Sequence, residues 1–217
     1  MRFFDLSQPV VDGGPNCPVH PPVIIDRISD HPKDGWRLEF LRFATHTGTH
    51  LDAPLHKISG GRSIDEYPLE AFAGRSVAID LTGIKADHPI GPNDFARIEP
   101  AVWRDAIVLL ATGWGNRRAK SDEWLYHSPA LSPAGATWLV ERGIRGVGID
   151  HFSIGGMTND NTRTHEILLG AGVWIIEDLR FAPGWKEVAA KGTFQALPLN
   201  FPGASGTPCR AVFVLQD

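Results

Sequence analysis

Cysteine is scarce in this 217-residue chain, which contains only two. Cys17 and Cys209 lie almost at opposite ends of the sequence and form no C-x-x-C pair. Two cysteines in a chain of this length do not make a disulfide framework, which favours a reducing compartment. We therefore expect a cytoplasmic protein, stabilised by the core that its 42% of hydrophobic residues are sufficient to build.

Long apolar runs are missing too. No stretch approaches the roughly 20 apolar residues that a membrane span requires. Near the start of the chain, Asp5 and Pro9 leave no room for the apolar core of a signal peptide. The sequence therefore predicts a soluble protein that is not exported and has no membrane partner.

An excess of positive charge is also lacking. The formal net charge is −4, and the basic residues are scattered apart from a short cluster at 117–120, so nucleic acid is not an expected partner. The glycines at 143–148 stand in the wrong order for a G-x-G-x-x-G nucleotide motif, and 203–207 fails G-x-S-x-G at its last position. The expected partner is a small-molecule substrate.

Many short strands are predicted, because 23 glycines and 17 prolines are spread through the chain. Strand-like apolar runs recur at 23–25, 36–43, 76–81, 106–111, 146–149, 172–176 and 211–215. The run 36–43 alternates cleanly, and Trp36 within it is expected in the core.

Helices are fewer. The clearest is predicted over 132–142, where Ser132 is an N-cap, Pro133 suits the first helical position and Gly143 ends the helix. Weaker helices are expected near residue 93 and over 164–169. The mixture indicates a strand-rich α/β fold, and no linker divides 1–217 into more than one domain.

The densest group of chemically active side chains is the segment 46–56, His-Thr-Gly-Thr-His-Leu-Asp-Ala-Pro-Leu-His, which holds three of the nine histidines. In an extended chain the even-numbered His46, His50, Asp52 and His56 would project to one side. Four residues of straight strand span about 13 Å, which is too far for two imidazoles to share one ion at about 2 Å each. The chain must therefore bend between His46 and His50, and Gly48 is best suited to provide the bend.

Two imidazoles and a carboxylate form a three-ligand set that leaves a coordination position open for water, which is typical of catalytic metal sites. Another carboxylate, that of Glu177, ends the apolar run 173–176. A charge at the end of a strand borders a cleft more readily than it enters a core. The sequence thus predicts a metal site.

The segment 46–56 resembles the H-x-G-T-H-x-D-A-P-x-H motif of the cyclase family of metal-dependent hydrolases, which includes bacterial kynurenine formamidase and isatin hydrolase. The likeness continues through most of the chain, at 60–61, 76–80, 112–114 and 197–199. The resemblance implies a single-domain, cyclase-like swivelling β/β/α fold. It also implies a homodimer or homotetramer in which N-terminal segments reach toward a neighbour's active site.

The resemblance further implies a centre of two divalent ions, for which zinc and manganese both suit the ligands. One ion would be held by His46, His50 and Asp52, with Asp52 bridging to a second ion that His165 and Glu177 complete. Glu166, beside His165, remains a competing candidate. His56 corresponds to the catalytic acid/base, and its unperturbed pKa of about 6.5 suits that role.

Candidate substrate contacts lie outside the motif. Kynurenine formamidases typically carry Pro-x-Trp-Pro-Gly-Asp near the N-terminus, with the tryptophan on the aromatic substrate, whereas this chain has Pro-Asn-Cys-Pro-Val-His at 15–20. This departure argues against N-formylkynurenine as the substrate. The candidate contacts are Cys17, His20, Trp114, His151 and Ser153.

The function expected from these features is metal-dependent hydrolysis of a small-molecule amide C–N bond, in the manner of a formamidase. Two alternatives remain open. One is ring-opening hydrolysis of a cyclic amide, as in isatin hydrolase. The other is a non-catalytic metal or small-molecule binding protein that has kept the ligands, against which the presence of His56 beside the ligand set argues.

Overall fold

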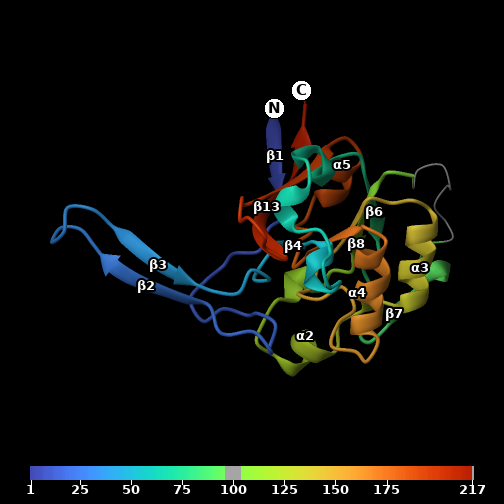
Figure 1. Ribbon diagram of the computed structural model, residues 1–217, viewed down its shortest axis with the longest axis horizontal. Coiled ribbons are helices and arrows are strands. Elements are labelled where there is room, and N and C mark those ends of the chain that lie inside the picture. Colours follow the sequence, from blue (N-terminus) through green and yellow to red (C-terminus); the bar gives the residue numbers. More distant parts are fainter. Residues whose placement is uncertain (96–103, 217) are drawn as a thin grey trace.

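A nine-stranded sheet runs through the protein, whose computed structural model describes residues 1–95 and 104–216 (Figure 1). The strand order is β5-β12-β13-β4-β11-β10-β8-β6, and β1 pairs with β13. One half is parallel and consists of β6 (Ser76–Asp80), β8 (Ile107–Ala111), β10 (Gly146–Ile149) and β11 (Trp174–Glu177). The antiparallel half consists of β1 (Arg2–Asp5), β4 (His50–Asp52), β5 (Ala73–Gly74), β12 (Thr193–Pro198) and β13 (Gly206–Leu215).

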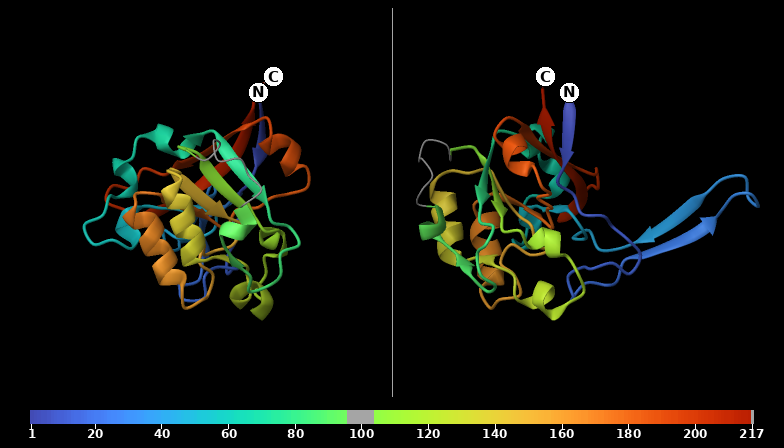
Figure 2. Two further views of the ribbon diagram at one scale, coloured as in Figure 1. Left: turned by 90° about the vertical axis from the view of Figure 1, so that its right-hand side faces the viewer. Right: turned by 180° about the vertical axis from the view of Figure 1, so that it is seen from behind.

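Both faces of the parallel half are covered. All five residues of β8 are buried, as expected for an apolar strand inside a parallel sheet. Val108 and Leu110 pack toward α3 (Pro133–Glu141) and α4 (Asn161–Gly170), which lie side by side in Figure 2. The alternate residues of β8 enter a second core cluster with side chains of η3 (Leu69–Phe72), α5 (Trp185–Ala189), β12 and β13.

The remaining elements are short. They are the helices α1 (Pro92–Phe95) and α2 (Asp122–Tyr126), the strands β7 (Pro89–Ile90) and β9 (Ala130–Leu131), and the 3-10 helices η1 (Pro54–His56), η2 (Ile64–Glu66) and η5 (Trp114–Arg117). Across the described residues, no helix is long and apolar enough to cross a membrane.

One hairpin leaves the body of the molecule. Strands β2 (Ile24–Ser29) and β3 (Leu38–Arg42) pair with each other and extend outward as an arm (Figures 1 and 2). Trp36 is 74% exposed and Phe40 is 55% exposed. The prediction that Trp36 belongs to the core is therefore wrong, because no layer formed by the described residues covers either face of this strand.

The strand-rich mixed α/β class expected from the sequence is confirmed. Helix α3 keeps its predicted capping, since the Ser132 Oγ accepts a hydrogen bond from the Gly135 amide at 3.1 Å. Gly143, just after this helix, has a φ of +69°, which is accessible to glycine at little cost.

Candidate metal centre

Strand β4 places two predicted ligands in the middle of the sheet. His50 and Asp52 stand two residues apart, so their side chains share one face. In the neighbouring antiparallel strand β11, Glu177 lies directly opposite His50. All three are buried, with at most 4% of each residue exposed. The pairing of two short strands therefore brings Glu177 to His50 and Asp52, although at least 125 residues separate it from them in sequence.

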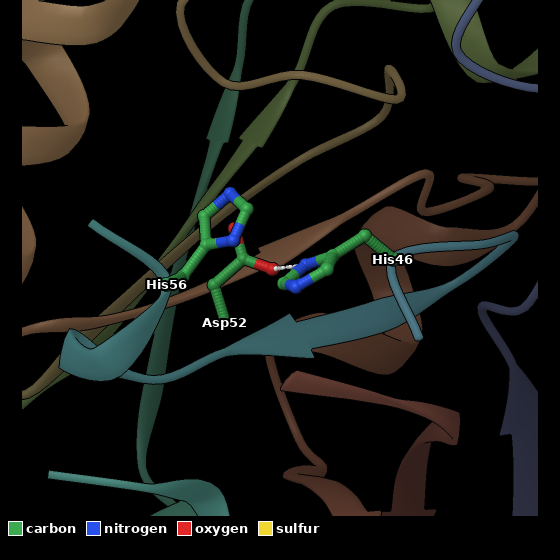
Figure 3. A group of neighbouring side chains, drawn as sticks. All are labelled: His46, Asp52 and His56. Carbon is green, nitrogen blue, oxygen red and sulfur yellow. Dashed lines mark hydrogen bonds and ion pairs between the residues drawn. The ribbon is translucent and has the colours of Figure 1, made fainter. Parts of the chain in front are cut away.

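The predicted bend at Gly48 is present. Gly48 has a φ of +63°, and a Cβ there would lie 2.8 Å from the Val10 side chain, so a larger residue would be both strained and crowded. Because of the bend, the His46 ring, which precedes it in the chain, lies against Asp52, with His46 Nδ1 2.6 Å from Asp52 Oδ1 (Figure 3). Its Nε2 lies 2.9 Å from the Ser205 hydroxyl.

His56 reaches the site by a different route from the one predicted. The extended chain ends after β4, and Pro54 begins the 3-10 helix η1, which ends at His56. The ring centroids of His56 and His46 are 3.9 Å apart, and Figure 3 shows both rings beside the Asp52 carboxylate. The even-numbered spacing of a strand thus explains His50 and Asp52, but the position of His56 depends on the turn at Pro54.

His165 joins the centre from helix α4. Its Nε2 is 3.3 Å from Glu177 Oε1 and 3.8 Å from Asp52 Oδ2. Its Nδ1 lies 2.9 Å from the Asn161 carbonyl, which fixes Nδ1 as a donor and directs Nε2 to the centre. The competing candidate Glu166 instead forms an ion pair with Arg163 on the same helix, at 3.5 Å. The carboxylate that lies beside His165 in the centre is that of Glu177, as preferred from the sequence.

The donor atoms around His50 fit a divalent metal. Ligands about 2.0–2.1 Å from a tetrahedral ion lie about 3.3–3.4 Å from one another. His50 Nε2 is 3.3 Å from Asp52 Oδ1 and 3.4 Å from Glu177 Oε2. Asp52 Oδ2 is buried without a hydrogen-bond partner, which a bound cation would satisfy. Imidazole and carboxylate donors together suit zinc or manganese.

Two groups of possible ligand atoms share Asp52. One comprises His50, Asp52 and Glu177, and the other comprises His46, Asp52 and His56, each with ligand atoms within 4.8 Å of one another. Asp52 is the common member, as a bridging ligand would be. The second group also brings the expected acid/base His56 within reach of a metal ligand position.

The electrostatics of the centre favour bound positive charge. Burial opposes ionisation of Asp52, but His46 and His50 outweigh it and hold the pKa of that carboxyl well below its ordinary value. Burial likewise opposes protonation of His50, but Asp52 and Glu177 raise the pKa of its ring well above the ordinary value. A divalent ion would compete with protons for these donors.

His56 behaves differently from His50. Burial is the main influence on its ring and lowers its pKa to about 4, although the charge of Asp52 acts in the opposite direction. The imidazole is therefore neutral at pH 7 and able to accept a proton, but its pKa lies below the value of about 6.5 expected from the sequence as suited to an acid/base.

A cavity of about 380 Å³ opens in front of these groups. Three predicted substrate contacts, Cys17, His20 and Ser153, line it. Burial raises the pKa of the Cys17 thiol and lowers that of the His20 ring, so both side chains are neutral at pH 7.

The other two predicted contacts lie behind the cavity wall. Trp114 is 3% exposed and donates from Nε1 to the Trp124 carbonyl at 3.2 Å. His151 is fully buried and has its Nε2 2.9 Å from the same carbonyl. Its ring lies 4.0 Å from that of Phe152, which does line the cavity. Trp114 and His151 therefore pack behind Phe152, and neither of them lines the cavity.

Several contributors to the site were missed from the sequence. Ser205 contacts His46, and Gly206 leaves room for its ring, since a Cβ at Gly206 would lie 2.6 Å from His46 Cε1. Lys57 and Thr162 line the cavity. The position of Lys57 beside the motif was a signal that could have been used, whereas Ser205 and Gly206 are recognisable only once β13 is paired with β4.

Comparisons with known proteins identify the family of this chain. Residues 4–155 match the sequence profile of a family described as "Putative cyclase". The kynurenine formamidase of Salinibacter ruber (strain DSM 13855 / M31) is 32% identical over 179 residues, which cover 79% of this chain and 77% of that protein.

Two solved structures are similar along the whole chain. Isatin hydrolase A from Labrenzia aggregata, bound to benzyl benzoate, has a TM-score of 0.85 and 27% identity, covering 100% of this chain and 94% of that one. A potential metal-dependent hydrolase with cyclase activity has a TM-score of 0.80 and 28% identity, covering 100% of this chain and 98% of that one. Sequence profile, curated relative and solved structures agree, and the protein belongs to the cyclase family.

Proposed function

We propose that the protein is a divalent-metal-dependent hydrolase that cleaves the C–N bond of a small-molecule amide. The observation that carries the proposal is the convergence of His50, Asp52 and Glu177 at the spacing of metal ligands, beside a cavity of about 380 Å³. Similarity to a kynurenine formamidase and to isatin hydrolases supports the class, an amidohydrolase that acts on non-peptide C–N bonds.

Two ions are proposed on the family resemblance, with His46, His50 and Asp52 at one, and Asp52, His165 and Glu177 at the other. The spacing of the ligand atoms instead groups His50 and Glu177 with Asp52, and His46 and His56 with Asp52. A divalent ion bound here would lower the pKa of a water molecule and polarise a carbonyl oxygen. Hydrogen bonds from the backbone orient two of the proposed ligands. The Gly48 carbonyl oxygen lies 2.8 Å from His50 Nδ1, and the Ile154 amide donates to Glu177 Oε1 at 2.7 Å.

His56 is proposed as the acid/base. Its ring faces the cavity and is neutral at pH 7, because burial lowers its pKa to about 4. It accepts a proton from the attacking water and donates it to the leaving nitrogen, so that an amine departs in place of an unstable amide anion. The neutral Cys17 and His20 side chains, and Ser153 beside Phe152, line the same cavity and are proposed to contact the substrate.

Ring-opening of a cyclic amide is the second candidate reaction. It is favoured by the likeness to isatin hydrolase A over the whole chain, at a TM-score of 0.85. The same ligands and His56 would serve it, because hydrolysis of a lactam and of an open amide breaks the same type of bond.

The test combines metal analysis with a hydrolysis panel of N-formylkynurenine, isatin and simple cyclic imides, with and without a chelator. We expect bound divalent metal and chelator-sensitive turnover of at least one amide class. Metal-free protein with no chelator-sensitive turnover would instead support a binding protein. Activity on open or cyclic amides alone would decide between the two reactions.

We also propose that the protein is a homodimer or homotetramer in which the β2–β3 arm packs on a second copy. An isolated two-stranded hairpin is marginally stable in water. The arm nevertheless exposes a series of large apolar side chains, namely Ile28, Trp36, Leu38, Phe40 and Leu41. It also connects the cavity residue His20 to the candidate ligand His46, so an interface on the arm would stabilise the site. A cytoplasmic location is proposed from the two free thiols.

A further inference from the structure

We propose that Lys57 binds an anionic group of the substrate, so that the amide hydrolysed at this centre carries a carboxylate. The inference rests on the proposed hydrolase function and specifies its substrate class. Lys57 lies immediately after His56, at the end of η1, and it lines the same cavity as the candidate metal ligands.

The ammonium group of Lys57 is available for a ligand. In the parts of the chain that the structure describes, no carboxylate lies within ion-pair distance of its Nζ, and its one polar side-chain contact is the Thr162 hydroxyl at 3.5 Å. Lys186, in contrast, is paired with Asp80 on the surface. Lys57 thus has a charge without a counter-ion.

The other charges of the cavity do not neutralise Lys57. Glu177, which also lines the cavity, is 4% exposed and is surrounded by the His50 and His165 rings and the Ile154 amide. Cys17 and His20 are neutral at pH 7, since burial raises the pKa of the thiol and lowers that of the ring. Besides the proposed metal centre with its histidines and carboxylates, the described lining therefore offers a substrate carboxylate one further cation, Lys57.

The shape of the lining adds to the expected chemistry. Val19, Phe152 and Met157 form apolar parts of the wall, whereas Lys57 and Thr162 form a polar part. A planar or apolar body can pack on the first group while a carboxylate receives hydrogen bonds from the ammonium and the hydroxyl. Lys57 adjoins His56 in sequence, and both residues line the cavity.

The test compares two formamides of similar shape, N-formylanthranilate and its uncharged methyl ester, on the metal-loaded protein. We expect Lys57→Met to lower the ratio of kcat/KM for the acid to kcat/KM for the ester at least tenfold, mainly through the KM of the acid. Lys57→Arg retains the charge and should keep most of the ratio. Lys85→Met, which removes an exposed lysine outside the cavity lining, is the matched control.

Direct binding separates failure of this inference from failure of the proposed function. Calorimetry with benzoate and benzamide, each with the metal-loaded wild type and Lys57→Met, requires no turnover. Benzoate should bind at least tenfold more weakly to Lys57→Met, and its binding to the wild type should weaken with salt. Equal benzoate affinities for the two proteins would overturn the role of Lys57, even if the hydrolase activity is confirmed. If benzoate binding depends on Lys57 but no amide is hydrolysed, only the proposed reaction would be refuted.

Discussion

His56 is the residue whose role is most sharply testable. It lies beside the candidate ligands His46 and Asp52, but its neutral ring faces the cavity. We expect His56→Ala to lower kcat/KM by a factor of about 10² to 10⁴, the usual contribution of general acid–base catalysis, while the metal content stays unchanged. Metal analysis and steady-state kinetics on the same preparation measure both quantities.

A matched control for this variant is His88→Ala, because His88 pairs with Asp94 outside the cavity lining. Loss of metal together with activity in His56→Ala would identify His56 as a ligand in the group of His46 and Asp52. Normal turnover would remove it from the mechanism altogether.

His151 affects stability in acid. Burial lowers the pKa of its ring to about 4, whereas an unfolded histidine titrates near about 6.5. The unfolded chain therefore takes up the proton first as pH falls. The stability that neutral His151 contributes is fully present above about pH 6.5 and is lost as pH falls to about 4, a change of about 3 kcal/mol for the difference in pKa.

Urea unfolding between pH 7 and pH 4.5 tests the effect of His151. His151→Gln can still donate to the Trp124 carbonyl but does not titrate, so it should be less stable than the wild type at pH 7 and lose less stability in acid. Parallel pH profiles of the two proteins would contradict the assignment. The comparison cancels the contributions of other histidines.

At the scale of elements, the β2–β3 arm has the clearest consequence. Its exposed apolar side chains are proposed to contact a second copy, so Trp36→Asp combined with Phe40→Asp should produce a monomer and reduce activity. Sedimentation across a range of protein concentrations measures the oligomeric state. Leu69→Asp, an exposed apolar residue on the body of the molecule, is the control. An unchanged assembly in the arm variant would place the interface elsewhere.

Helix α3 has a separate, local requirement. Ser132→Ala removes the side-chain acceptor of the Gly135 amide and should lower the free energy of unfolding by about 1 kcal/mol. Denaturant unfolding checks the loss, and metal content should be unaffected because the helix contributes no candidate ligand. Ser132→Asp, which preserves a capping acceptor, should recover most of the stability.

The elements found from the sequence are those whose local pattern agrees with their surroundings. The runs at 106–111 and 146–149 are apolar throughout and coincide, to within one residue, with the buried parallel strands β8 and β10, and the cap at Ser132 marks α3. Strand β4 was not separately predicted, because it has three residues and two of them are polar. Its extended form is stabilised by pairing with β11 and β13, which no local pattern records.

For the whole molecule, metal should contribute to stability. Asp52 and Glu177 bury two carboxylates in one centre, and a ligand that binds only the folded state stabilises it by mass action. At metal concentrations about 1,000 times the dissociation constant, the gain is about 4 kcal/mol, or on the order of 10 °C in Tm for a chain of this size.

Thermal unfolding with and without a chelator measures that gain. Chelation should lower both Tm and activity, and added zinc or manganese should restore them. In Asp52→Asn, which weakens the shared ligand, the chelator should change Tm little. A wild-type Tm that does not respond to the chelator would contradict a metal bound within the fold.

The sequence by itself determined the fold class and predicted a metal centre. His46, His50 and Asp52 are close in the chain, so a shared ligand role for them could be predicted from spacing alone, and the bend at Gly48 that the prediction required is present. The cyclase family was also recognisable, because its motif is contiguous.

The tertiary structure decided which distant groups join that centre. The β4–β11 register places Glu177 opposite His50, and packing of α4 brings His165 to both carboxylates. The tertiary structure also buries Trp114 and His151 behind the cavity lining and places Lys57 in that lining. These outcomes depend on strand register and side-chain packing between segments far apart in the chain, for which local sequence patterns carry no distance information.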